Sequence, residues 1–256
     1  MNKIKSTFSV LAASVVLSVP ASAVITWQTN TALIAGGNVE TFVDNTGDFE
    51  LGYNANGASG VDATVNGVLF TTSVSGSTVT GPGGVTALLN TQAANDNNTG
   101  AFGDGAFSGN GSIFDLLRGA SFDLNSVTLG GLTIGQEYLI QIFTHDGRAN
   151  RGTDLDSRAG FGDGTGSTEA VGISGLSDAA IDSNAGGTGF SVIGTFTATQ
   201  ETLTFNVFGS TNGSNPAASP TGAGQINALQ VRSIPEPSST ALLGLGGLAL
   251  LLRRKK

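Results

Sequence analysis

Short apolar segments, separated by clusters of Gly, Asn, Asp, Ser and Thr, constrain the fold of this chain more than any other feature. Glycine alone accounts for 39 of the 256 residues, and clusters of these residue types form turns. In 201–208 (ETLTFNVF), Leu203, Phe205 and Val207 alternate with polar residues, which predicts a strand with one buried and one wet face. In 136–144 (QEYLIQIFT), apolar residues occupy both faces, which predicts a strand in the middle of a sheet.

The remaining segments extend the same pattern. Further strands are predicted at 65–73, 121–129, 190–197 and 225–232. Helical signals are nearly absent, apart from a short helix expected over 112–118. Short strands with frequent turns are typical of antiparallel sandwiches. The predicted fold class is therefore all-β, an antiparallel β-sandwich (jelly roll), flanked by an N-terminal signal helix and a C-terminal short hydrophobic helix.

The N-terminus has the three parts of a secretory signal peptide. Lys3 and Lys5 form a positive region, residues 8–19 are apolar or small, and an Ala21-Ser22-Ala23 site follows. Ala21 and Ala23 suit the small-residue pockets of a signal peptidase, so cleavage is expected after Ala23. A permanent transmembrane anchor is the alternative, but this apolar run is too short to span a bilayer comfortably.

The C-terminus has a second three-part pattern. Pro235-Glu236-Pro237 precedes the mostly apolar stretch 240–252, and Arg253-Arg254-Lys255-Lys256 ends the chain. The four positive charges keep this end on the cytoplasmic side. Because spanning takes about 20 residues, the stretch is better suited to holding the chain in the membrane transiently than to anchoring it.

This tail resembles the PEP-CTERM protein-sorting domain. The resemblance covers Ser233–Lys256, with Pro235, Glu236, Pro237, Arg253 and Arg254 as the sorting residues. It implies removal of the tail by an exosortase, a membrane-embedded cysteine-dependent transpeptidase, in a Gram-negative bacterium that makes exopolysaccharide. The expected organisation is therefore a signal peptide at 1–23, a β-sandwich domain at 24–232 and a sorting tail at 233–256.

The body between the two ends is acidic and has no cysteine. It contains five arginines and eighteen acidic residues, so its net charge is −13. Nucleic acid and anionic membrane surfaces would repel such a body. Without cysteines there is no disulfide framework for an exported chain. Stability therefore has to come from packing, hydrogen bonds or a bound ion.

The body also resembles the jelly-roll bodies of many PEP-CTERM proteins, which are similar to galactose-binding-like and malectin-like carbohydrate-binding domains. Three segments carry this likeness, LTIGQEY at 132–138, GTFTA at 194–198 and QINALQV at 225–231. They are strand and turn patterns. The resemblance therefore implies a fold and does not identify ligand residues.

No enzyme signature appears in the sequence. The absence of Cys excludes thiol catalysis, and a single histidine, His145, excludes multi-histidine zinc sites. A catalytic triad through His145 is a remote alternative to a surface or packing residue. Eighteen acids contain many accidental carboxylate pairs, so a polysaccharide hydrolase remains only a second alternative. The chain is predicted not to be an enzyme.

The segment 145–166 (HDGRANRGTDLDSRAGFGDGTG) is the most suggestive candidate site. Three hypotheses apply to it. Asp146, Arg148 and Arg151 can bind a sugar or uronate carboxylate, because arginine forks suit carboxylates. Calcium, which prefers oxygen ligands, has a candidate ligand set in Asp154, Asp156 and Asp163. In the third, the charges only pair with each other.

A sugar site usually also requires an exposed aromatic ring. The candidates in the body, each equally compatible with a core position, are Trp27, Tyr53, Phe102, Phe107 and Phe161. The sequence therefore predicts an exported, exosortase-processed cell-surface or matrix protein without catalytic activity. A carbohydrate-binding module that recognises exopolysaccharide is the alternative.

Overall fold

The computed structural model describes the sandwich and leaves its longest connections undescribed. The described residues are 22–28, 31–33, 39–55, 60–74, 76–91, 96–97, 111–145, 160–165, 189–208 and 224–235. The signal segment up to residue 21 and the tail from residue 236 lie outside them, as do the two helices expected there. None of the helices within the described ranges is long and apolar enough to cross a membrane.

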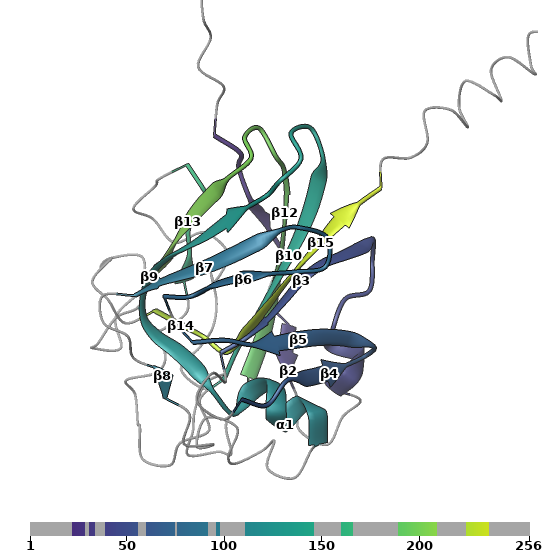
Figure 1. The fold of residues 1–256 in the computed structure, drawn as a ribbon, viewed down its shortest axis with the longest axis vertical. Coiled ribbons are helices and arrows are strands. Elements are labelled where there is room, and N and C mark those ends of the chain that lie inside the picture. The colour runs from purple at the N-terminus through teal and green to yellow at the C-terminus, as the bar shows by residue number, and fades with distance from the viewer. Residues whose placement is uncertain are drawn as a thin grey trace, which may run out of the picture.

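Two β-sheets form the fold, and their strands cross in projection in Figure 1. The larger sheet has the order β1-β12-β10-β15-β3-β5-β4, with β2 also paired to β12. Its strands are β1 Thr26–Trp27, β2 Thr31–Leu33, β3 Asp48–Asn54, β4 Ala63–Val65, β5 Val68–Thr72, β10 Glu137–Thr144, β12 Gly189–Thr197 and β15 Ala228–Ile234. All its pairs are antiparallel except β3 with β5.

The smaller sheet has the order β11-β13-β9-β7-β6, and β8 and β14 both pair with β9. Its strands are β6 Thr78–Thr80, β7 Thr86–Thr91, β8 Asp96–Asn97, β9 Ala120–Gly130, β11 Gly160–Phe161, β13 Leu203–Phe208 and β14 Gly224–Ile226. Two short helices complete the described elements, the 3-10 helix η1 at Val39–Phe42 and α1 at Gly111–Leu117. The predicted all-β sandwich and its single short α-helix are confirmed.

The main core lies between the sheets. Leu203, Phe205 and Val207 of β13 point into it, while Thr204 on the opposite face is exposed, as the alternation predicts. In β10, which lies between β12 and β15, seven of eight residues are buried. The central position expected from its two apolar faces is therefore confirmed.

A second core covers the outer face of the larger sheet. Phe143 and Ala228 reach outward from β10 and β15 and pack against β4, β5 and α1. The rings of Phe143 and Phe70 meet edge to face, with centroids 5.8 Å apart. The larger sheet is thus packed on both faces, which explains why its central strands are apolar on both sides.

Two predicted strands differ in the structure. The segment 65–73 is not one strand, because Asn66 and Gly67 form a two-residue turn with φ of 51° and 75° that separates β4 from β5. An Asn-Gly pair between strand-like runs is typical of this turn. The segment 225–232 is divided at Asn227, where the chain passes from β14 in the smaller sheet to β15 in the larger.

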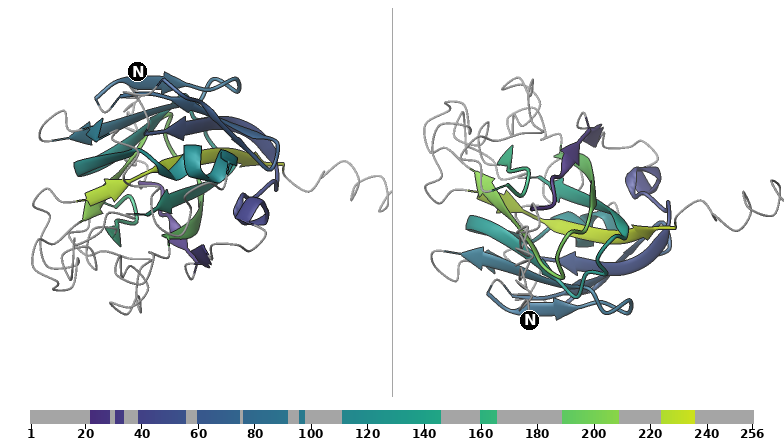
Figure 2. Two further views of the ribbon diagram at one scale, coloured as in Figure 1. Left: turned by 90° about the horizontal axis from the view of Figure 1, so that it is seen from below. Right: turned by 90° about the horizontal axis from the view of Figure 1, so that it is seen from above.

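The chain leaves the sandwich toward the tail at one end of the larger sheet. At this end β10 begins, β12 ends and β15 ends, because Glu137 pairs with both Thr197 and Ile234. Asp48 begins β3 here and pairs with Ser233. We call this the exit end, formed by the turns 131–136 and 198–202 together with Asp48, Glu137 and residues 232–235. The right-hand view in Figure 2 looks down on it, with β15 pointing outward.

Candidate functional site

The expected sorting tail begins inside the sheet. Ser233 and Ile234 are the last two residues of β15, so the strand continues past the expected domain boundary at 232. The Ser233 hydroxyl donates to Glu50 Oε1 at 2.6 Å, and Gln136 Nε2 donates to the Ile234 carbonyl at 2.6 Å. Pro235 is exposed directly after the strand. Of the other sorting residues, Glu236, Pro237, Arg253 and Arg254 lie outside the described residues.

Arg232, which precedes these residues, is buried, with 7% of its surface exposed. Its guanidinium donates to three main-chain carbonyls, those of Thr46 (2.8 Å), Asn45 (3.3 Å) and Gly47 (2.8 Å). The group also lies over the Phe49 ring, 5.8 Å from its centroid. The planar fork of an arginine can serve several acceptors at once. Arg232 therefore locks β15 to the segment 45–47.

Gln141 and Gln230 continue this buried polar layer on the outer face of the larger sheet. Gln230 Nε2 donates to Gln141 Oε1 at 2.7 Å and to the Asp44 carbonyl at 2.9 Å. Gln141 donates in turn to the Phe42 carbonyl. The layer ties the chain around η1 to β10 and β15. The side chains of this layer hydrogen-bond to other groups of the protein and thereby hold its elements together.

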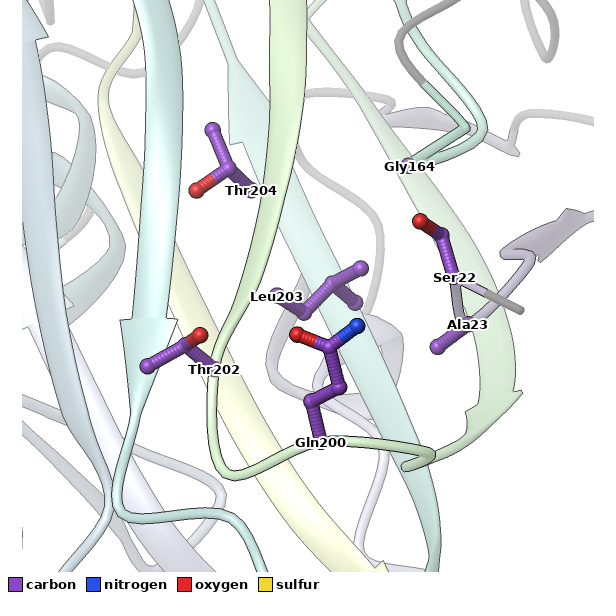
Figure 3. A pocket seen from close by; sticks show the side chains of 7 residues that line it. All are labelled: Ser22, Ala23, Gly164, Gln200, Thr202, Leu203 and Thr204. Carbon is purple, nitrogen blue, oxygen red and sulfur yellow. The ribbon is translucent and has the colours of Figure 1, made fainter. Parts of the chain in front are cut away.

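The expected signal-cleavage site also lies near the exit end. Ala23 is buried, with 6% of its surface exposed, and belongs to the main core, whereas Ala21 lies outside the described residues. Ser22 and Ala23 line a cavity of about 220 Å³ with Gly164, Gln200 and the start of β13 (Figure 3). A peptidase needs accessible chain. Cleavage after Ala23, which stays a prediction, would therefore have to precede closure of the sandwich.

A second cavity, of about 210 Å³, lies on the other side of this segment. It is lined by the exposed Val24, the carboxylate-bearing Glu137, and Thr26, Thr195, Phe196 and Thr197. Both cavities are smaller than the 300–1,000 Å³ typical of small-molecule sites. Their linings contain one carboxylate between them. A glycosidase uses two carboxylates on either side of the scissile bond, and neither cavity offers this arrangement.

At the opposite end, Asn227 organises a buried polar cluster. Its Nδ2 donates to the carbonyls of Leu117 and Gly119, both at 2.8 Å, and its Oδ1 accepts from the His145 amide at 2.7 Å. Gln225 Nε2 donates to the His145 carbonyl at 2.9 Å. His145 itself is buried, with 1% exposed. The residue therefore lies in the interior and not on the surface.

The structure tests little of the segment 145–166. Asp146, Arg148, Arg151, Asp154 and Asp156 lie outside the described residues, so the sugar and calcium hypotheses stay predictions. Asp163 is described, and its Oδ1 accepts from the amide (2.9 Å) and the hydroxyl (2.6 Å) of Thr165. Its carbonyl accepts from the Ile25 amide at 2.7 Å. Asp163 thus shapes a local turn.

The described aromatic candidates lie in or against the core. Tyr53 and Phe161 are fully buried, and Trp27 packs on Phe161 with ring centroids 5.5 Å apart. These three rings belong to or pack on the core, and Phe102 and Phe107 lie outside the described residues. Within the described ranges, no group of three or more His, Asp or Glu residues is arranged so that it could hold a metal ion.

The outer face of the smaller sheet is a feature that sequence reasoning missed. It is a surface of hydroxyl, amide and one aliphatic side chain, made of Thr78, Thr80, Thr86, Leu88, Asn90, Ser126, Thr128, Thr204 and Asn206. Asn90 Nδ2 donates to Ser126 Oγ at 3.0 Å and to Thr128 Oγ1 at 3.1 Å. The hydroxyls of Thr128 and Thr204 are 2.9 Å apart. The sequence signal for this surface is the presence of Thr and Asn at alternate positions of strands that pair with one another.

The comparisons with known proteins identify the tail. Residues 233–255 match the model of the PEP-CTERM protein-sorting motif. The comparisons with curated proteins and with solved structures gave no match. The motif identifies the chain as an exported, surface-directed protein that is targeted to an exosortase.

Proposed function

We propose that this protein is a cell-surface or extracellular-matrix component of a Gram-negative bacterium, without catalytic activity, whose tail is removed by an exosortase after export. The sorting motif at 233–255 carries this proposal. It is supported by the position of the motif, because the chain emerges from β15 at one end of the sandwich and Pro235 is exposed. Cleavage by a signal peptidase after Ala23 and transient retention in the inner membrane by the stretch 240–252 belong to the same proposal.

Deleting Pro235–Pro237 is expected to block removal of the tail. The exosortase would lose the residues it recognises, so the chain should keep its tail and remain with the membrane fraction. The measurement is loss of a C-terminal epitope and surface delivery, followed in the native host. Deleting Asn212–Ser214 shortens the chain equally and leaves every residue of the motif at 233–255 in place, so it serves as the control. Unchanged tail removal without the triplet would refute the proposal.

Polysaccharide binding is the second candidate function. The outer face of the smaller sheet favours it, because hydroxyl and amide groups on neighbouring strands, about 4.8 Å apart, suit a neutral polyhydroxylated chain. The charge of the body does not oppose a neutral polymer. Arg148 and Arg151, which lie outside the described residues, offer a different candidate site, which suits an acidic sugar.

Binding to a panel of polysaccharides, including the host exopolysaccharide, separates these two sites. Thr204→Glu places a charge in the middle of the outer face and is expected to weaken binding there about tenfold, or roughly 1.4 kcal/mol. Thr64→Glu, at an exposed position of β4, is the matched control. If Arg148→Ala or Arg151→Ala weakens binding instead, the site lies in the arginine segment. If none of the polymers binds saturably, only the structural role is left as the function.

A further inference from the structure

We propose that the exit end of the sandwich is a docking surface for the exosortase, and that its carboxylates meet a basic surface of that enzyme. The inference rests on the proposed function and adds a contact outside the sorting motif. Three observations carry it: the short length of chain between the sheet and the Pro-Glu-Pro triplet, the anchoring of that chain, and the charge of the surface around it.

The connection between the folded body and the triplet is very short. Ile234 is the last strand residue and its carbonyl is bonded to Gln136. From Ile234 to Pro237 there are three residues, which extend over about 10 Å at most. An enzyme that acts at the triplet must therefore approach the exit end to within this distance. Contact between the two surfaces follows from the geometry.

The connection cannot easily be lengthened by peeling β15 from the sheet. Ser233 is paired on both sides, with Tyr138 of β10 and Asp48 of β3. Behind it, Arg232 is held by the three carbonyls of 45–47. Pulling Arg232 out would break its hydrogen bonds to all three of these carbonyls at once. The position at which the tail leaves the body is therefore fixed.

The surface around this position is acidic. Asp48, Glu137 and Glu201 are exposed there. Within the described part of the exit end, the basic side chain is Arg232, which is buried beneath the 45–47 carbonyls. An anionic lipid surface would repel this end. A protein surface with basic side chains would attract it and would orient the triplet toward the enzyme.

An exposed apolar residue adds to this surface. Ile134, at the tip of the turn between β9 and β10, has 63% of its surface exposed, the largest value among the exposed large apolar residues of the described chain. The turn that carries Ile134 borders Glu137 and Glu201, and an apolar contact beside polar groups is usual in protein interfaces. The partner that these features fit is the extracytoplasmic face of the membrane-embedded exosortase.

The test measures the rate of tail removal from the full-length protein in its host. The double variant Glu137→Gln, Glu201→Gln removes two negative charges and retains the main-chain bonds of both residues. It is expected to slow tail removal about fivefold, because charge complementarity acts mainly on the rate of encounter. The control, Thr64→Lys with Thr71→Lys, makes the same change in net charge at exposed positions of β4 and β5. It should be processed at the unmodified rate.

A second arm inserts about twelve Gly/Ser residues between Ile234 and Pro235, which extends the connection by roughly 20 Å. The body then no longer has to contact the enzyme, so processing should become slower and insensitive to the Glu137 and Glu201 substitutions. Equal rates for the double variant and the unmodified chain would overturn the docking surface. Faster processing after the insertion would also overturn it, because the exit end would then be an obstacle. The Pro235–Pro237 deletion tests the sorting motif independently, so failure of the docking surface leaves the proposed function intact.

Discussion

Replacing Asn227 with alanine is expected to lower the free energy of unfolding by about 3–5 kcal/mol. The substitution removes a side chain that satisfies the carbonyls of Leu117 and Gly119 and the amide of His145. These groups are deeply buried, so water does not replace the lost partner without rearrangement, and each unpaired group costs about 1–3 kcal/mol. The effect is large because Asn227 stands where the chain changes sheets.

Urea unfolding of the purified protein measures this change. Asn45→Ala is the control, because Asn45 is exposed and surface substitutions usually change stability by less than about 0.5 kcal/mol. Asn227→Asp keeps an oxygen for the His145 amide but turns its second oxygen toward two carbonyls, so it should destabilise the fold at neutral pH as well. A midpoint for Asn227→Ala close to that of the unmodified protein would show that the passage from β14 to β15 does not depend on this side chain.

Replacing Arg232 with methionine is the second large effect, expected to be about 2–4 kcal/mol. Methionine fills much of the same volume but leaves the carbonyls of 45–47 without their donors. The cost of moving the guanidinium out of water is recovered at the same time, which keeps the net loss below the sum of three bonds. Arg232→Lys should restore only part of the loss, because one ammonium cannot reproduce the arginine fork.

The same unfolding measurement tests Arg232, with Arg118→Met as the matched control. Arg118 pairs with Asp115 at 3.6 Å, and its side chain is 26% exposed. Partly exposed pairs of this kind contribute about 1 kcal/mol or less. If Arg232→Met is no more destabilising than Arg118→Met, the three carbonyl contacts do not hold β15 in place.

Much of the strand pattern was predictable because it depends on neighbours along the chain. The alternation of apolar and polar residues in β13 predicts that one face of the strand is buried, and the apolar residues on both faces of β10 predict that both are buried. Both predictions are confirmed. The turn at Asn66-Gly67 was missed although its signal is local. The apolar pattern continues across the turn and predicts one strand, whereas Asn66 and Gly67, both with positive φ, separate β4 from β5.

Other features depend on contacts that no local pattern contains. The division of 225–232 into β14 and β15 follows from Asn227, whose partners are up to 110 residues away. Arginine side chains are usually exposed in folded proteins. Arg232 is nevertheless buried, because its guanidinium bonds to carbonyls of a segment that lies 185–187 residues earlier in the chain. Trp27, Tyr53 and Phe161 were equally compatible with a sugar platform and with the core, and the packing of the sheets places them in or against the core.

The sequence by itself determined the sorting motif and the alternation of the strands, because the motif is a run of consecutive residues and a strand exposes its two faces by a fixed period. Tertiary structure decided which face of each sheet is covered, that Ser233 and Ile234 remain in β15, and that the exposed carboxylates Asp48, Glu137 and Glu201 gather around the exit of the tail. These properties arise when strands distant in sequence are paired. Their physical origin is the register of the sheet, which a linear pattern does not contain.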